Sequence, residues 1–130
     1  MEPYRLQLKV RDYECDMQGI VNNSVYQNFL EHARHEFLIA KNMNFAEITR
    51  LGIHLVVTRV EIDYLKPLVS GDEFYVTARC ERKGRLRFVF HQEIYRQSDN
   101  TKMLSAIVTG TSINENGRPI KTDLLGAICE

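Results

Sequence analysis

The sequence has no excess of charge of either sign, no long apolar run and little cysteine. Its 130 residues include 17 basic and 17 acidic residues, which gives a net charge of zero. Nucleic-acid-binding proteins usually carry a basic excess, so the charge balance excludes that class of partner. No apolar run approaches the ~20 residues of a membrane span, and the first ten residues lack the apolar centre of a signal peptide. We therefore expect no membrane span and a cytoplasmic location.

Cysteine occurs only at Cys15, Cys80 and Cys129. The number is odd, and no two cysteines have the CxxC spacing of redox or zinc motifs. Disulfide frameworks belong mainly to oxidising compartments. The cysteines therefore predict reduced thiols in a cytoplasmic protein.

Segments typical of linkers are also missing. The chain has no low-complexity tract, no internal repeat and no stretch rich in Pro, Gly and Ser, which predicts one domain over residues 1–130. The length excludes a TIM barrel, which needs ~250 residues. A single chain of this size has little room for a deep pocket of its own.

Two periodicities divide the first forty residues. Apolar and polar residues alternate from the start, which predicts a strand over Tyr4–Tyr13 with one buried face. A polar loop, Glu14–Val21, follows. Next come three N-cap residue types and an apolar repeat of three and four residues, which predict a helix over 23–40. Its apolar stripe consists of Tyr26, Phe29, Leu30, Ala33, Phe37 and Ala40.

The rest of the chain is predicted to be mostly strands. A short helical turn over Phe45–Leu51 ends at Gly52, and alternating segments then cover 56–64, 74–81, 86–94 and 103–113. Short turns between these segments predict antiparallel pairing of consecutive strands, a β-meander. The expected fold class is α+β, with one long helix packed on one face of an antiparallel sheet.

Two carboxylates precede the predicted helix, in the run Glu14-Cys15-Asp16. One of them could act as a nucleophile or general base beside the helix N-terminus, where unpaired N–H groups and the helix dipole can polarise a carbonyl. The same residues would also fit a solvated acidic loop that favours the dipole. The spacing alone leaves both interpretations open.

A longer motif favours the chemical interpretation. The run VRDYECDMQGIVNNSVYQNFLEHAR (10–34) resembles the signature of the 4-hydroxybenzoyl-CoA thioesterase family, which has the hot-dog fold. The resemblance continues at 60–67 (VEIDYLKP), at Gly71-Asp72 and at 116–119 (NGRP). It therefore covers essentially the whole chain and implies a hot-dog fold and acyl-CoA thioesterase activity.

The resemblance assigns roles to single residues. Asp16 matches the catalytic carboxylate, which attacks the thioester or activates water. Asn23 matches the residue whose backbone N–H holds the thioester oxygen, and Gly19 and Tyr26 match substrate-binding positions. The chain departs from the family at Asn23, where many members have His. No metal or cofactor is implied, because coenzyme A is part of the substrate and a thiolate leaves readily.

A basic run at Arg82–Arg87 surrounds a predicted turn. It could be a solvated hairpin tip, or Lys83 and Arg85 could bind the phosphates of coenzyme A. Other candidates are weaker. Cys15 between two acids should be a poor nucleophile, His32 and His35 lack further metal ligands, and Glu31 has the position of an exposed helix residue.

These observations predict a thioesterase for a small or medium acyl-CoA. The alternatives are a non-catalytic acyl-CoA-binding dimer module and a 3-hydroxyacyl-thioester dehydratase, which would need a histidine paired with an acid. Leu38 and Ile39 lie off the main helix stripe, and the predicted sheet has edges to cover. We therefore expect a homodimer or dimer of dimers, with the pocket shared between chains.

Overall fold

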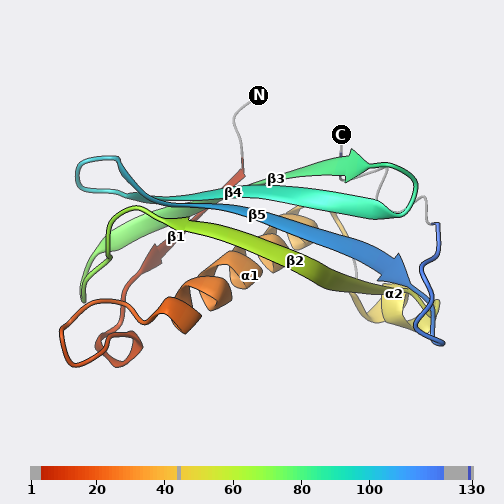
Figure 1. Ribbon diagram of the computed structural model, residues 1–130, viewed down its shortest axis with the longest axis horizontal. Coiled ribbons are helices and arrows are strands. Elements are labelled where there is room, and N and C mark those ends of the chain that lie inside the picture. The colour runs from red at the N-terminus through yellow and green to blue at the C-terminus, as the bar shows by residue number, and fades with distance from the viewer. Residues whose placement is uncertain (1–3, 44, 122–128, 130) are drawn as a thin grey trace.

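The computed structural model describes residues 4–43, 45–121 and 129. Its strands are β1 (Tyr4–Lys9), β2 (His54–Tyr64), β3 (Glu73–Lys83), β4 (Arg87–Arg96) and β5 (Thr101–Ile113). They form one antiparallel sheet in the order β1-β3-β4-β5-β2 (Figure 1). The helices are α1 (Asn23–Ala40) and α2 (Phe45–Arg50), and a 3₁₀ turn, η1, covers Asp12–Glu14. The α+β prediction is confirmed.

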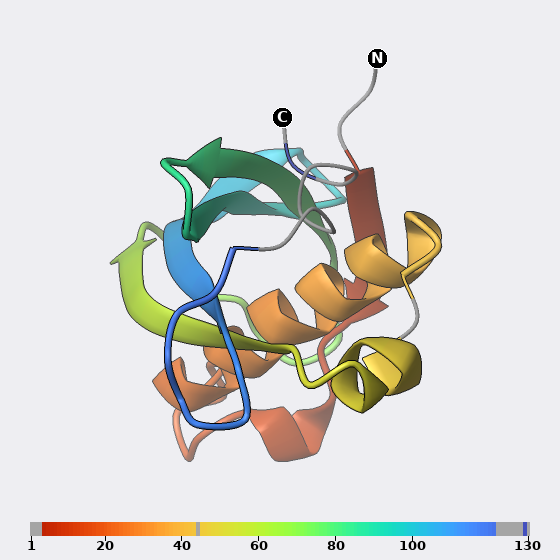
Figure 2. The ribbon, with the colours of Figure 1, turned by 90° about the vertical axis from the view of Figure 1, so that its right-hand side faces the viewer.

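Helix α1 has the predicted bounds and lies in the curve of the sheet (Figure 2). Five of the six stripe residues are buried, and the sixth, Ala40, is exposed. Leu38 is buried instead and belongs to a cluster with Phe88 and Phe90 of β4. Leu38 therefore gives no support to a second copy, contrary to the sequence-based expectation, whereas Ile39 is 52% exposed.

The predicted meander is wrong for β2, which pairs with β5 and not with β3. The reason lies in the connection between β2 and β3. Leu68 in this connection is fully buried, and its N–H donates to the hydroxyl of Tyr26 at 3.0 Å. Its carbonyl accepts from the N–H of Val21 at 2.9 Å. These bonds hold the connection against the start of α1, so the chain passes around the end of the sheet instead of forming a tight hairpin.

Strand β1 ends at Lys9, four residues earlier than predicted. Val10 is buried, and its backbone binds the connection before β3: its N–H donates to Asp72 at 2.9 Å, and its carbonyl accepts from Gly71 at 3.1 Å. The chain then turns through η1. The end of β1 is thereby fixed next to the loop that carries Asp16.

The prediction of three reduced thiols is also wrong. Cys80 on β3 and Cys129 form a disulfide, with their Cα atoms 4.5 Å apart. The two cysteines are 49 residues apart in sequence and follow no spacing motif, so only the folded chain brings them together. Both pack in the cluster that contains Phe37, and Cys15 is the free cysteine.

Reduction of this disulfide is expected to lower the free energy of unfolding by about 2–4 kcal/mol, because it releases a cross-link that closes a long loop in the unfolded chain. Denaturant titration with and without dithiothreitol measures the change. Thiol titration of the unreduced, unfolded protein should find one thiol per chain, and none in the C15S variant. Three thiols in protein that has not met a reductant would contradict the disulfide.

Candidate functional site

Asp16 lies in a tight loop between η1 and α1. Cys15 and Val21 form a bridge at the base of this loop. Inside it, the N–H of Asp16 donates to Ile20 at 2.9 Å, and the N–H of Gly19 donates back to the carbonyl of Asp16 at 3.0 Å. Gly19 has a φ of 82°, a left-handed conformation that glycine adopts without strain. Gly19 therefore shapes the loop that carries Asp16.

The Asp16 carboxylate is held by one of its two oxygens. Oδ1 accepts from the N–H of Gln18 at 2.8 Å and from the N–H of Ile20 at 3.3 Å. Oδ2 has no hydrogen-bond partner among the residues that the structure describes, and the residue is exposed. The carboxylate is thus fixed in orientation, with one oxygen open to a ligand.

The second carboxylate of the pair points elsewhere. Glu14 is buried, and its Oε1 accepts from the N–H of Arg11 at 2.8 Å and lies 3.5 Å from the Arg11 Nε. Glu14 therefore holds η1, while Asp16 holds its own loop. The two carboxylates do not form a shared site, and Glu14 is not part of a solvated loop.

Cys15 has the environment of a poor nucleophile. Burial and then the nearby carboxylates, Asp16 and Glu14 first among them, raise the pKa of its thiol. A raised pKa keeps the thiol protonated at neutral pH, and the thiolate is the reactive form. Cys15 is therefore a weak candidate for the nucleophile of this loop.

The start of α1 adjoins this loop. Asn22 is the N-cap residue, and its N–H donates to the carbonyl of Glu14 at 3.0 Å. The N–H of Val25 donates to Asn22, but within the described chain the N–H groups of Asn23 and Ser24 have no acceptor. Such groups, at the positive end of the helix dipole, can stabilise an oxyanion.

Two tyrosines support the helix start. Tyr26 is buried, its hydroxyl accepts from Leu68, and burial is the main cause that raises its pKa. It therefore positions the helix, and its contact with substrate stays a prediction. Tyr64, at the end of β2, donates to the carbonyl of Asn23 at 3.5 Å and is 48% exposed. Sequence reasoning gave Tyr64 no role, although it lies in the segment 60–67 (VEIDYLKP) that shares the family resemblance.

Lys83 and Arg85 lie far from Asp16 in one chain. Lys83 is the last residue of β3 and Arg85 lies in the turn to β4, at the opposite end of the sheet from the loop before α1 (Figure 1). Both are exposed. The structure brings Asp16, Gly19, Asn23 and Tyr26 together but not these two cations, which could meet the same substrate only from a second copy.

The helix histidines form no metal site in the described ranges, where no group of three or more His, Cys, Asp or Glu residues could hold an ion. His35 lies 3.9 Å from Glu31 in an exposed pair one helical turn apart. None of the helices described is long and apolar enough to cross a membrane.

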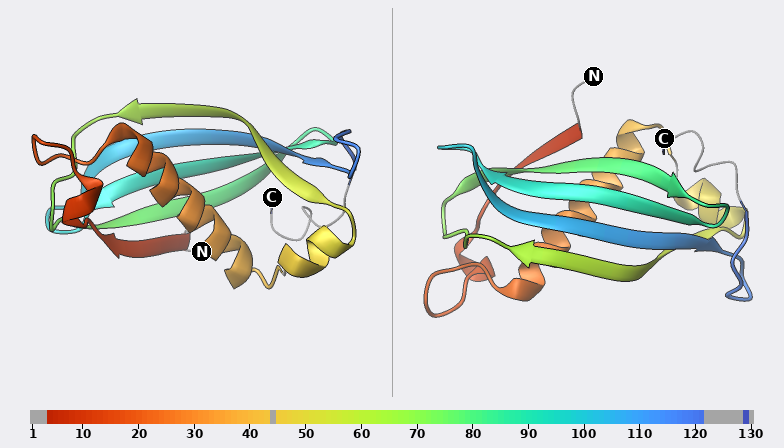
Figure 3. Two further views of the ribbon diagram at one scale, coloured as in Figure 1. Left: turned by 90° about the horizontal axis from the view of Figure 1, so that it is seen from below. Right: turned by 45° about the horizontal axis from the view of Figure 1, so that its top comes forward.

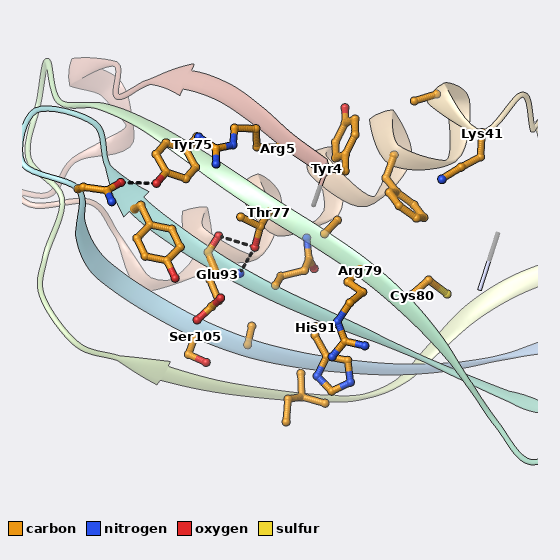
Figure 4. Close-up of a pocket in the computed structure, with 18 residues that line it drawn as sticks. Tyr4, Arg5, Lys41, Tyr75, Thr77, Arg79, Cys80, His91, Glu93 and Ser105 are labelled. Atoms are coloured by element: carbon orange, nitrogen blue, oxygen red, sulfur yellow. Dashed lines mark hydrogen bonds between the residues drawn. The ribbon is translucent and has the colours of Figure 1, made fainter. Parts of the chain in front are cut away.

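A hollow of about 1030 Å³ lies mainly over the outer face of the sheet (Figure 4). Its side chains bind mostly one another: the rings of Tyr75 and Tyr95 stack at 5.2 Å, and Arg5 covers Tyr75 at 4.5 Å. Thr77 exchanges hydrogen bonds with the backbone of Glu93. The hollow does not include the Asp16 loop, so its size does not make it the reaction site.

The smaller hollow, about 450 Å³, lies on the helix side of the sheet. It is bounded by the C-terminal half of α1, by α2 and by the beginning of β2. Most of its lining is apolar, with Leu38, Leu55 and Phe90 among the residues that face it.

Comparison with known proteins identifies the family of the chain. The family model described as "Thioesterase superfamily" matches residues 18–103. Acyl-acyl carrier protein thioesterase ATL3, chloroplastic, of Arabidopsis thaliana is 37% identical over 120 residues, which are 92% of this chain and 63% of that protein. Long-chain acyl-CoA thioesterase FadM of Escherichia coli is 30% identical over 108 residues, which are 83% of this chain and 81% of that protein.

The fold has close structural counterparts. Slr0204 from Synechocystis, a 1,4-dihydroxy-2-naphthoyl-CoA thioesterase, aligns with a TM-score of 0.91 at 18% identity, over 99% of this chain and 97% of that chain. This confirms the hot-dog fold. The chain spans about 63% of the length of ATL3.

Proposed function

The chain belongs to the thioesterase superfamily, and from that premise we propose that it hydrolyses acyl-CoA thioesters with Asp16 as the reacting carboxylate. The observation that carries the proposal is the open Oδ2 of Asp16 on the loop that leads directly into α1, whose first N–H groups are unpaired in the described chain. A carboxylate and an oxyanion site side by side are what attack on a thioester carbonyl requires.

The reaction can follow either of two courses from this geometry. Asp16 attacks the carbonyl carbon, the C–S bond breaks, coenzyme A leaves as a thiolate, and water then hydrolyses the mixed anhydride. Alternatively, Asp16 takes a proton from a water molecule, which attacks the same carbon. In both, the N–H of Asn23 stabilises the negative oxygen, so the loss of the family's usual histidine side chain leaves this donor in place.

A second copy is part of the proposal. One edge of β2 pairs with β5, and the other is open in the described structure. Val57, Val60 and Tyr64 of this strand are 47%, 38% and 48% exposed, and Leu65 just beyond is 51% exposed. An open strand edge with exposed apolar side chains favours pairing with another chain. Pairing there would cover β2 and supply cations from the partner.

The proposal is tested by release of the coenzyme A thiol from a panel of acyl-CoAs. We expect saturable release, detected with a thiol reagent against a protein blank that subtracts Cys15. Saturable binding without thiol release would instead identify a binding module. Loss of water from a 3-hydroxyacyl-CoA would identify a dehydratase. Cell fractionation tests the predicted cytoplasmic location. Disulfides such as Cys80–Cys129 occur mainly in oxidising compartments, so recovery in such a compartment would contradict that location.

A further inference from the structure

The smaller hollow is lined by residues of the C-terminal half of α1, of α2, of the beginning of β2 and of β4. Helix α1 crosses the sheet diagonally, so that its N-terminus lies near the end of β2 while its C-terminal half diverges from this strand (Figure 3). Helix α2 and the start of β2 bound the space that results. We call the hollow the distal pocket; its apolar lining includes Leu38, Ile53, Leu55, Val57, Phe88 and Phe90.

An apolar row on β2 connects the reaction site with the distal pocket. Tyr64, Ile62 and Val60 pair with Leu104, Ala106 and Val108 of β5, which are buried on the helix side. Paired residues of an antiparallel ladder point to the same face, so these three β2 side chains also point toward α1.

The row continues across a bulge. After Thr58 the register shifts, and Val57 pairs with Gly110 and Leu55 with Ser112. Val57 and Leu55 both line the distal pocket, whereas the other end of the row, Tyr64, binds the carbonyl of Asn23. The row therefore begins at the oxyanion donors and ends in the distal pocket.

Three of the five polar side chains that line the distal pocket, those of Arg34, Glu31 and His35, have partners nearby. Arg34 donates to Gln92 at 3.0 Å, and Gln92 donates to the carbonyl of Leu30 at 3.0 Å. Glu31 lies beside His35. The floor of the pocket, formed by Leu38, Phe88 and Phe90, is apolar and suits an apolar ligand.

The length of α1 gives the distance that an acyl chain must span. At 1.5 Å per residue, Glu31, where the pocket lining begins, is about 12 Å from Asn23, and Leu38 is about 22 Å from it. An extended alkyl chain advances about 1.25 Å per carbon, from a bond of about 1.5 Å and an angle near 111°. A chain of about ten carbons therefore reaches the level of Glu31, and one of about eighteen carbons reaches that of Leu38. Along β2, at about 3.3 Å per residue and without the bulged residue, Val57 is about 20 Å from Tyr64, so a chain of about sixteen carbons reaches Val57.

We propose that the distal pocket receives the far end of a long unbranched acyl chain, so that the enzyme selects fatty-acyl thioesters over short or aromatic ones. This rests on the proposed function and departs from the sequence-based expectation of a small or medium acyl group. A benzoyl ring held at Asp16 would leave the distal pocket unused.

The first experiment compares kcat/KM for saturated acyl-CoAs from four to eighteen carbons, below their micelle concentrations, and for benzoyl-CoA. We expect kcat/KM to rise about fourfold for each methylene added once the chain enters the pocket, since burial of one methylene strengthens binding by about that factor. The kcat/KM for benzoyl-CoA should be as low as that for the shortest acyl-CoAs. A profile that is flat, or that falls beyond eight carbons, overturns the proposal.

The second experiment places a bulky group where the row enters the pocket. V57W should lower the ratio of kcat/KM for the sixteen-carbon to the eight-carbon substrate at least tenfold. The matched control is I107W, the same change at a half-exposed residue of the neighbouring strand β5, on the outer face, which should leave this ratio unchanged. A V57W profile parallel to that of the parent overturns the proposal.

Binding separates this proposal from the proposed function. Calorimetry on the D16N variant should give a Kd for palmitoyl-CoA at least tenfold lower than for butyryl-CoA, and V57W in that background should remove the difference. If the parent releases no thiol from any acyl-CoA, the proposed function fails while this readout still decides the pocket. Equal affinities for the two ligands overturn the pocket assignment alone.

Discussion

Replacement of Asp16 by asparagine is expected to lower kcat/KM for acyl-CoA hydrolysis by at least two orders of magnitude. The amide can neither attack the thioester nor take a proton from water, and a general base alone contributes that much. The fold should survive, because the amide oxygen can still accept from the N–H groups of Gln18 and Ile20, as Oδ1 does. Steady-state thiol release measures the change.

The control for D16N is another carboxylate that holds a turn. Asp99 in the β4–β5 hairpin accepts from the N–H of Thr101 at 3.2 Å and binds Arg96. These hydrogen bonds, that from Arg96 first, lower the pKa of Asp99, so its stabilising effect is present at neutral pH and is lost as the pH falls through the lowered pKa. D99N should therefore lower stability at pH 7 and leave kcat/KM unchanged. Parental turnover in D16N would remove Asp16 from the mechanism.

Replacement of Val60 by lysine is expected to yield monomers and to lower kcat/KM at least tenfold, also for butyryl-CoA, whose acyl chain is too short to reach Val60 along β2. Val60 is a partly exposed residue in the middle of β2, whose outer edge is open. A lysine on an edge strand blocks edge-to-edge pairing, because the partner would have to bury its charge. Without a partner, the apolar row of β2 stays uncovered, and the Lys83 and Arg85 cations remain at the far end from Asp16.

Light scattering coupled to size exclusion measures the mass of V60K, and circular dichroism tests its folding. The control, I107K, introduces the same charge at a residue of equal exposure, 38%, on the outer face of β5. It should remain a dimer if β2 is the primary interface. A parent protein that is monomeric and fully active would contradict the second copy, and an active V60K monomer would contradict its role in the site.

Local interactions explain what could be predicted from the sequence. Helix α1 begins at Asn23 and ends at Ala40 as predicted, because its buried residues repeat at the helical period along one continuous segment. The buried residues of β3, Phe74, Val76, Ala78 and Cys80, follow the predicted alternation for the same reason. The motif around Asp16 also lies within one segment, so its place before the helix could be read directly.

The sequence by itself determined the elements, their order and the acidic loop before the helix, since each depends on neighbours within a few residues. Only the tertiary structure decided which strands pair, which carboxylate stays open and which cysteines bond. Leu68 holds the β2–β3 connection against Tyr26, and this leaves β2 at the sheet edge. Glu14 and Asp16 are near neighbours in sequence, yet their different hydrogen bonds leave only Asp16 exposed. These outcomes depend on contacts between segments that are distant in sequence, and the periodicity of a single segment carries no information about such contacts.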